Sequence, residues 1–200
     1  MSDLFDQKAG NWDGQSIPQQ LSATIGPQII KHVRLNKEMS VMDFGAGTGL
    51  LTAHIAPLVK EIAAVDISQA MLDQLVAKPE FHNKVEAYCQ NILETPLDKK
   101  FDLIISAMAM HHVHNTPLML ERFAQHLKQG ARVALADLDS EDGSFHPPKT
   151  EGIFHLGFDR EAFSLLLQTA GFENIEFLTA HVITKEQTDY PVFLVLAQKR

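Results

Sequence analysis

The sequence predicts a doubly wound α/β fold, and three observations predict it. Short apolar runs alternate with helical periods through most of the chain, the first run ends in a glycine-rich turn, and the C-terminal part contains two adjacent strand patterns. Such alternation is typical of parallel strands linked by crossover helices, whereas two adjacent strands add an antiparallel hairpin. We therefore expect a mostly parallel sheet that ends in one C-terminal hairpin.

The first five strands are expected at short runs that, except for the third, are continuously apolar, as strands covered on both faces should be. These runs are Val41–Phe44, Ile62–Val65, Val85–Tyr88, Leu103–Ala107 and Arg132–Leu138. The hairpin strands are expected at Asn174–Thr184 and Val192–Gln198, joined by the polar stretch Lys185–Asp189.

Helices are expected between the strands, at Gly49–Leu58, Ser68–Lys78, Pro117–Lys128 and Arg160–Ala170. Ser68, Thr116 and Asp159 are the expected N-caps of the last three, because their side-chain oxygens can accept from free backbone N–H groups. A further helix over Pro18–Val33 precedes the first strand, and we expect it to lie over the carboxyl ends of the strands.

The composition predicts one globular domain. The 200 residues suffice for one hydrophobic core, and 45% apolar with 21% charged residues argue against a disordered chain. The N-terminus lacks the pattern of a signal peptide, no run reaches the roughly 18 apolar residues of a membrane span, and Cys89 has no second cysteine to pair with. We therefore expect a cytoplasmic protein with no membrane partner.

The formal net charge of −8 argues against nucleic acid as a partner. Binding to a polyanion requires clustered Lys and Arg, and the 17 basic residues of this chain are scattered. The sequence does not indicate an oligomeric state.

The segment Val41–Gly49 joins an apolar strand, a glycine-rich turn and a helix start, an arrangement suited to a nucleotide-like ligand. A dinucleotide fingerprint needs a third glycine where this chain has Leu50. Asp43 would face a pyrophosphate unfavourably, but it favours the positive ammonium and sulfonium groups of S-adenosylmethionine. A nicotinamide oxidoreductase is therefore disfavoured.

A second acid, Asp66, ends the next predicted strand. Its carboxylate can accept hydrogen bonds from both ribose hydroxyls, and the following Ile67 offers an apolar face to an adenine.

These motifs resemble those of class I S-adenosylmethionine-dependent methyltransferases, particularly small bacterial members of the ubiquinone-biosynthesis type. The resemblance covers nearly the whole chain and implies a Rossmann-like seven-stranded sheet of order 3-2-1-4-5-7-6, with S-adenosyl-L-methionine as cofactor. It implies a single domain in which residues 1–36 form an N-terminal lid and helix, and residues 37–200 form the cofactor-binding core. Residues 139–158, a long stretch without periodicity, are then the expected substrate-side loop.

The resemblance also assigns residues to the cofactor. The turn with Asp43, Gly45, Ala46, Gly47 and Gly49 is expected to hold the methionine portion, and Asp66 the ribose. Further expected contacts come from the N-terminal segment, the residues after the third strand and the end of the fourth strand, at Trp12, Ile67, Asn91, Ile92 and Ser106.

Asn91 stands near the position at which relatives commonly have an acid that accepts from the adenine amino group. Its carbonyl oxygen can still accept that hydrogen bond, although a charge-assisted bond becomes a neutral one.

Methyl transfer is an in-line displacement at an activated sulfonium, so the protein supplies alignment, exclusion of water and, for some acceptors, removal of a proton. His111 and His112 follow the fourth strand and are candidates for a general base, although packing or solvated histidines are the alternative. No cysteine or compact carboxylate partner accompanies them in the sequence, so we expect no metal.

The predicted function is methyl transfer from S-adenosylmethionine to an unidentified small-molecule acceptor. The alternative is a protein that binds S-adenosylmethionine for sensing or assembly without turnover.

Overall fold

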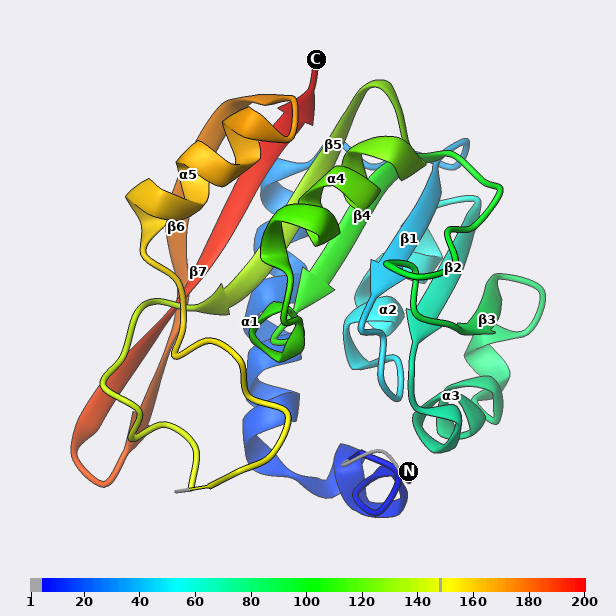
Figure 1. Cartoon of the computed structure of the whole chain (residues 1–200). Coiled ribbons are helices and arrows are strands. Elements are labelled where there is room, and N and C mark those ends of the chain that lie inside the picture. Colours follow the sequence, from blue (N-terminus) through cyan, green and yellow to red (C-terminus); the bar gives the residue numbers. More distant parts are fainter. Residues whose placement is uncertain (1–4, 148) are drawn as a thin grey trace.

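The computed structural model describes residues 5–147 and 149–200 and shows one sheet with helices on both faces (Figure 1). The described residues form seven strands: β1 (Ser40–Phe44), β2 (Glu61–Asp66), β3 (Val85–Cys89), β4 (Phe101–Ala107), β5 (Leu127–Leu138), β6 (Phe172–Lys185) and β7 (Thr188–Lys199). Their order is β3-β2-β1-β4-β5-β7-β6. Only β7 runs antiparallel to its neighbours β5 and β6. The predicted fold class, strand order and C-terminal hairpin are confirmed.

The helices in the described part of the chain are α1 (Ser16–His32), α2 (Leu50–Ile55), α3 (Gln69–Val76), α4 (Thr116–His126) and α5 (Arg160–Thr169). Short 3₁₀ turns accompany them at η1 (Ala9–Gly14), η2 (Ala56–Leu58), η3 (Pro79–Phe81) and η4 (Met110–His112). Within residues 5–147 and 149–200, none of these helices has the length and apolarity that crossing a bilayer requires.

Side-chain caps begin three of these helices. Ser68 and Asp159 accept backbone N–H groups of α3 and α5 at 3.2 and 2.8 Å, as predicted. The cap of α4 is Asn115 rather than the predicted Thr116, because the Asn115 side chain accepts a backbone N–H at 3.0 Å and Thr116 is already helical. Pro117 fits this first turn since it has no N–H to satisfy.

The boundary between α4 and β5 also differs from the prediction. The helix expected to reach Lys128 ends at His126, and the strand expected to begin at Arg132 begins at Leu127. Leu127 is buried and pairs with Phe101 of β4, so tertiary pairing shortens the helix.

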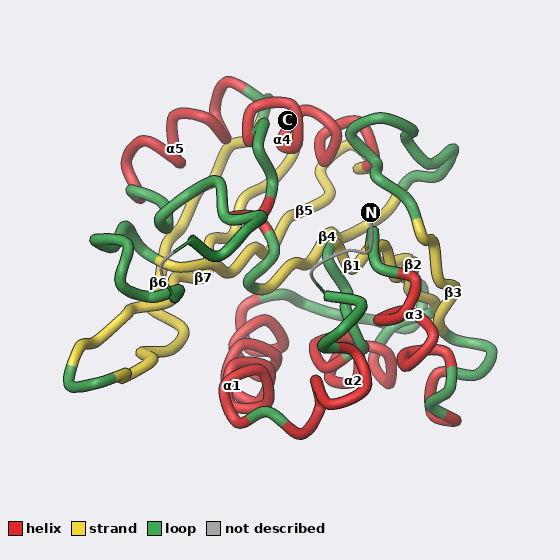
Figure 2. Tube along the Cα trace, turned by 60° about the horizontal axis from the view of Figure 1, so that its bottom comes forward, coloured by secondary structure: helices red, strands yellow, loops and turns green. Residues whose placement is uncertain are grey.

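The sheet separates two buried apolar clusters because successive side chains along a strand point to opposite faces. Val41 of β1 belongs to the cluster covered by α1, α2 and α3, and the next residue, Met42, to the cluster covered by α4 and α5. Figure 2 shows these two helical layers on either side of the strands.

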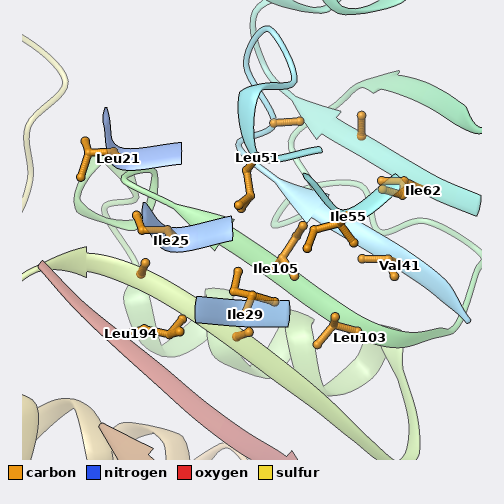
Figure 3. Close-up of a cluster of buried hydrophobic side chains, with 14 of the residues drawn as sticks. Leu21, Ile25, Ile29, Val41, Leu51, Ile55, Ile62, Leu103, Ile105 and Leu194 are labelled. Carbon is orange, nitrogen blue, oxygen red and sulfur yellow. The ribbon is translucent and has the colours of Figure 1, made fainter. Parts of the chain in front are cut away.

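Helix α1 lies on a face of the sheet, which corrects the prediction that it lies over the carboxyl ends of the strands. Its apolar stripe, Leu21, Ile25 and Ile29, is buried beside Leu51 and Ile55 of α2 (Figure 3). A stripe with this spacing needs a long apolar surface, and the sheet face provides one. Only the first turns of α1 reach the edge of the sheet where β1, β2 and β4 end.

Candidate active site

A cavity of about 810 Å³ lies at the carboxyl ends of the parallel strands β1, β2 and β4. Its volume is in the range of ligand pockets, about 300–1,000 Å³. The connections from β1 and β4 leave in opposite directions, and this switch point is where open α/β sheets bind ligands. The N-terminal segment and the loop 139–158 both contribute to its lining.

The glycine turn after β1 is fixed to the end of β2. The backbone N–H groups of Gly45 and Ala46 donate to the Val65 carbonyl at 2.8 and 3.1 Å, and that of Gly47 donates to the Asp66 carboxylate at 2.8 Å. The turn is therefore held in place by the neighbouring strand before any ligand arrives.

Two glycines of this turn are required for different reasons. Gly45 and Gly47 have φ angles of +68° and +55°, which favour glycine. A β-carbon on Gly45 would lie 2.3 Å from Cβ of Ala109, whereas a β-carbon on Gly47 would meet no atom of the described chain within 4 Å. Gly45 thus permits the close approach of two loops, and Gly47 leaves open space on the cavity wall.

Asp43 provides a buried carboxylate beside this turn. It lines the cavity but is only 1% exposed, and the Thr52 hydroxyl donates to it at 2.6 Å. Burial raises the pKa of Asp43 to about 7; the charge of Asp66 adds to this, and the hydrogen bond from Thr52 opposes it. A cationic ligand group would favour the ionised form of Asp43.

Asp66 holds the two turns that follow β1 and β2. One carboxylate oxygen accepts from Gly47 and the other accepts from the backbone N–H of Ser68 at 2.9 Å. Ile67, beside it, also lines the cavity and is 61% exposed, so it presents apolar surface to a ligand.

The turn after β3 contributes Asn91 to the cavity lining. Its side-chain oxygen accepts from the backbone N–H of Leu93 at 3.1 Å, and its side-chain nitrogen donates to Glu94 at 3.0 Å. Gln90 and Glu94 line the cavity as well, although neither was predicted as a site residue. The sequence could have indicated them, because both are polar residues in the turn that follows a parallel strand, where ligand contacts are expected.

Three predicted residues, Gly49, Ile92 and Ser106, do not line the cavity. A β-carbon on Gly49 would lie 2.7 Å from the Phe81 ring. Ile92 is fully buried in the cluster beneath α4 and α5, and the Ser106 hydroxyl donates to the Phe44 carbonyl at 2.8 Å. The structure therefore does not bring these side chains together with the other predicted site residues.

The N-terminal segment crosses the glycine turn. Phe5 and Trp12 line the cavity, and their rings pack edge to face with centroids 5.8 Å apart. The Asp13 carboxylate accepts from the Thr48 hydroxyl and forms an ion pair of 2.6 Å with Lys78. Sequence reasoning named Trp12 but missed Asp13, whose partners are distant in the chain. Residues 1–4 of the expected lid lie outside the described residues.

Histidines line the cavity near the end of β4, where His111 and His112 lie on η4. His111 Nδ1 lies 2.7 Å from the carboxylate of Asp137 on β5, and His112 Nδ1 lies 2.8 Å from the Gly152 carbonyl. His146 of the loop 139–158 joins them, with its ring centroid 5.2 Å from that of His111. All three histidines line the cavity, and sequence reasoning missed both Asp137 and His146.

The three histidines differ in protonation. Burial opposes the charged form of His111, but the charge and hydrogen bond of Asp137, together with Glu141, outweigh it and raise the pKa of His111 above 6.5. Burial and the neighbouring His111 lower the pKa values of His112 and His146 to about 4. His112 and His146 are therefore neutral near pH 7, and the pKa of His111 lies above its ordinary value.

The sheet order, the glycine turn with a buried acid and the second acid after the next strand define a class I S-adenosylmethionine-dependent methyltransferase fold and site. The family model described as a methyltransferase domain matches residues 19–177, so the chain belongs to this family.

Relatives agree with this membership. An uncharacterized methyltransferase of Schizosaccharomyces pombe is 29% identical over 157 residues, covering 70% of this chain and 55% of that protein. This chain thus spans about half the length of that relative.

Two solved structures share the fold. A complex of the Trm112 methyltransferase activator with a methyltransferase of Haloferax volcanii contains a chain of TM-score 0.80 at 14% identity, covering 99% of this chain and 98% of that one. Haemonchus contortus phosphoethanolamine N-methyltransferase 2 with bound S-adenosyl-L-methionine gives a TM-score of 0.72 at 15% identity, covering 87% and 52%. None of these three relatives is named for ubiquinone biosynthesis, so that finer resemblance stays a prediction.

Proposed function

We propose that this protein transfers the methyl group of S-adenosylmethionine to a small molecule enclosed between the glycine turn and the loop 139–158. One observation carries the proposal: the same cavity of about 810 Å³ is lined by the glycine turn and by His111, His112 and the loop 139–158. The cofactor and the acceptor can therefore bind in the same cavity, which direct methyl transfer between them requires.

The residues of the glycine turn suit the methionine portion of the cofactor. The Asp43 carboxylate would favour its ammonium group, and the open side of Gly47 allows the backbone to approach it. Asp66 would hold the ribose, Ile67 and Asn91 would lie along the adenine, and Trp12 would cover the bound molecule. The bound cofactor supplies an activated methyl group, and these residues align it and exclude water.

Replacing Asp66 by Ala is expected to weaken S-adenosylmethionine binding by about 2 kcal/mol or more, roughly 30-fold. Hydrogen bonds to a charged acceptor contribute about 1.5–3 kcal/mol each, and the ribose would lose such an acceptor. The loss of the Gly47 contact adds to the effect because the turn is then less fixed. Calorimetry measures the dissociation constant, and thermal melting checks that the variant is folded. An unchanged dissociation constant in a folded variant would show that Asp66 does not contribute to binding.

Two observations favour a small acceptor over a macromolecule. The N-terminal segment and the loop 139–158 both line the cavity and restrict the space for an acceptor, and the net charge of −8 disfavours nucleic acid. The Haemonchus contortus protein with a similar fold is named for a small acceptor, phosphoethanolamine.

Turnover separates the enzyme from the alternative, a cofactor-binding sensor or assembly protein. We would incubate the protein with S-adenosylmethionine and a panel of small hydroxyl, amine, thiol and carboxylate compounds, including catechol and benzoate, and measure release of S-adenosylhomocysteine. Release that depends on one compound supports methyl transfer. Tight cofactor binding without release over the whole panel would favour the sensor.

A further inference from the structure

We propose that His111 removes a proton from the methyl acceptor and that Asp137 acts as a positioning residue for its imidazole ring. This inference rests on the proposed methyl transfer and names the acceptor class: compounds whose nucleophilic oxygen, nitrogen or sulfur carries a proton before reaction. The geometry of the Asp137–His111 pair carries it.

Asp137 fixes both the ring and the backbone of His111. It is fully buried on β5, and one of its oxygens accepts the backbone N–H groups of Met110 and His111 at 2.9 and 3.2 Å. The other oxygen accepts from Leu138 at 2.8 Å and lies 2.7 Å from His111 Nδ1. Burial alone would raise the pKa of Asp137, but His111 and these hydrogen bonds lower it below its usual value.

An ionised carboxylate can only accept hydrogen bonds, so the proton of neutral His111 is on Nδ1 and the lone pair is on Nε2. That Nε2 is buried and has no hydrogen-bond partner among residues 5–147 and 149–200, although His111 lines the cavity. Buried polar atoms without a partner are uncommon and call for an explanation such as a catalytic role. A proton-bearing group of the acceptor is the natural partner.

The neighbouring histidines are less suitable as bases. His112 donates from Nδ1 to the Gly152 carbonyl, and its pKa of about 4 makes it a weak proton acceptor near neutral pH. His146 Nε2 is likewise buried without a partner among the described residues, but no carboxylate there accepts from its ring and its pKa is also about 4. The groups that face His111 are thus Asp137 from β5, His112 from η4, and His146 and Glu141 from the loop. The two carboxylates raise its basicity.

The step is balanced without another reactant. The acceptor heteroatom gives its proton to His111 Nε2 and bonds to the methyl carbon, while the carbon–sulfur bond breaks and leaves its electron pair on sulfur. The products are the methylated acceptor and S-adenosylhomocysteine, and the imidazolium beside Asp137 later releases its proton to solvent. The rate should therefore rise with pH through the raised pKa of His111.

The first test does not depend on the acceptor. NMR titration of the histidine rings in the cofactor-free protein should give His111 a pKa above 6.5, and Asp137→Asn should lower it. His82→Gln, at an exposed position outside the cavity, is the matched control and should leave the His111 titration unchanged. If Asp137→Asn does not fold, the His111 pKa measured in the wild-type protein tests the proposal on its own. A His111 pKa at or below the ordinary value would overturn the dyad.

The second test uses single-turnover transfer to catechol, whose hydroxyl is protonated near neutral pH, and to benzoate, which is already ionised. His111→Gln should slow the catechol reaction by about 10²–10⁴-fold and flatten its pH profile, with unchanged affinity for S-adenosylhomocysteine. His82→Gln should retain both the rate and the profile. Wild-type-like rates and profiles in His111→Gln, or methylation confined to benzoate, would overturn the base role. If no compound of the panel is methylated, the proposed function is overturned instead. The Asp137–His111 pair is then tested by the NMR titration alone.

Discussion

Asp43→Asn is expected to stabilise the cofactor-free protein above pH 7. Burial raises the pKa of Asp43 from an ordinary value of 3.8 to about 7, so holding the charged form in the folded protein costs about 4 kcal/mol. The stability contribution of the neutral acid is fully present below pH 3.8 and is lost as the pH rises through 7. Asparagine retains an acceptor for the Thr52 hydroxyl and carries no charge. The free energy of unfolding of the Asn variant should therefore increasingly exceed that of the native protein as the pH rises from 3.8 to 7.

The same substitution is expected to weaken S-adenosylmethionine binding and remove its pH dependence. In the native protein the cationic ligand selects ionised Asp43, so binding below pH 7 releases a proton. The affinity should therefore fall by up to about tenfold for each pH unit by which the pH is lowered below 7. The Asn variant has no group to ionise at this position, and its affinity should stay low and flat. Calorimetry at pH 6 and pH 8 in buffers of different ionisation enthalpy measures both affinity and proton release.

Asp98→Asn is the matched control because it removes the same charge from an exposed position. It should leave both the melting curve and the cofactor affinity nearly unchanged. An Asp43→Asn protein that is less stable than the native protein at pH 8, yet binds the cofactor as tightly, would contradict this account of the buried acid.

The sequence predicted the sheet well because each strand carries its own apolar pattern and each turn its own glycine or cap. Contacts between distant segments caused the errors. Leu127 joins β5 through its pairing with Phe101, which no local pattern indicates. The position of α1 depends on which apolar surface is free to receive its stripe, and this is known only when the sheet is assembled.

The candidate site divides in the same way. Asp43, Gly45 and Gly47 lie within five consecutive residues, so one segment of sequence was enough to predict that part of the cavity. Asp137 follows His111 by 26 residues and reaches it only because β4 and β5 are neighbours in the sheet. A usable signal existed, since Asp137 is an acid inside an apolar strand and, like Asp43, would require a partner.

Gly47→Ala is expected to leave the protein folded but weaken S-adenosylmethionine binding by at least about 100-fold, or roughly 2.7 kcal/mol. A left-handed conformation costs a non-glycine residue about 1–2 kcal/mol, and no described atom lies within 4 Å of the added carbon in the free protein. Gly47 lines the cavity, and the proposed site brings the cofactor against the backbone of this turn, where the added carbon would take up open space.

Gly45→Ala provides the contrast because its added carbon would lie 2.3 Å from Cβ of Ala109. Overpacking typically costs about 1–3 kcal/mol, and the φ angle of +68° adds about 1–2 kcal/mol. At about 2–4 °C per kcal/mol for a chain of this length, we expect the melting temperature to fall by about 4–20 °C, against about 2–8 °C for Gly47→Ala. Melting and calorimetry on the two variants therefore separate loss of fold from loss of site. Native affinity in a folded Gly47→Ala protein would mean that the cofactor does not approach this turn.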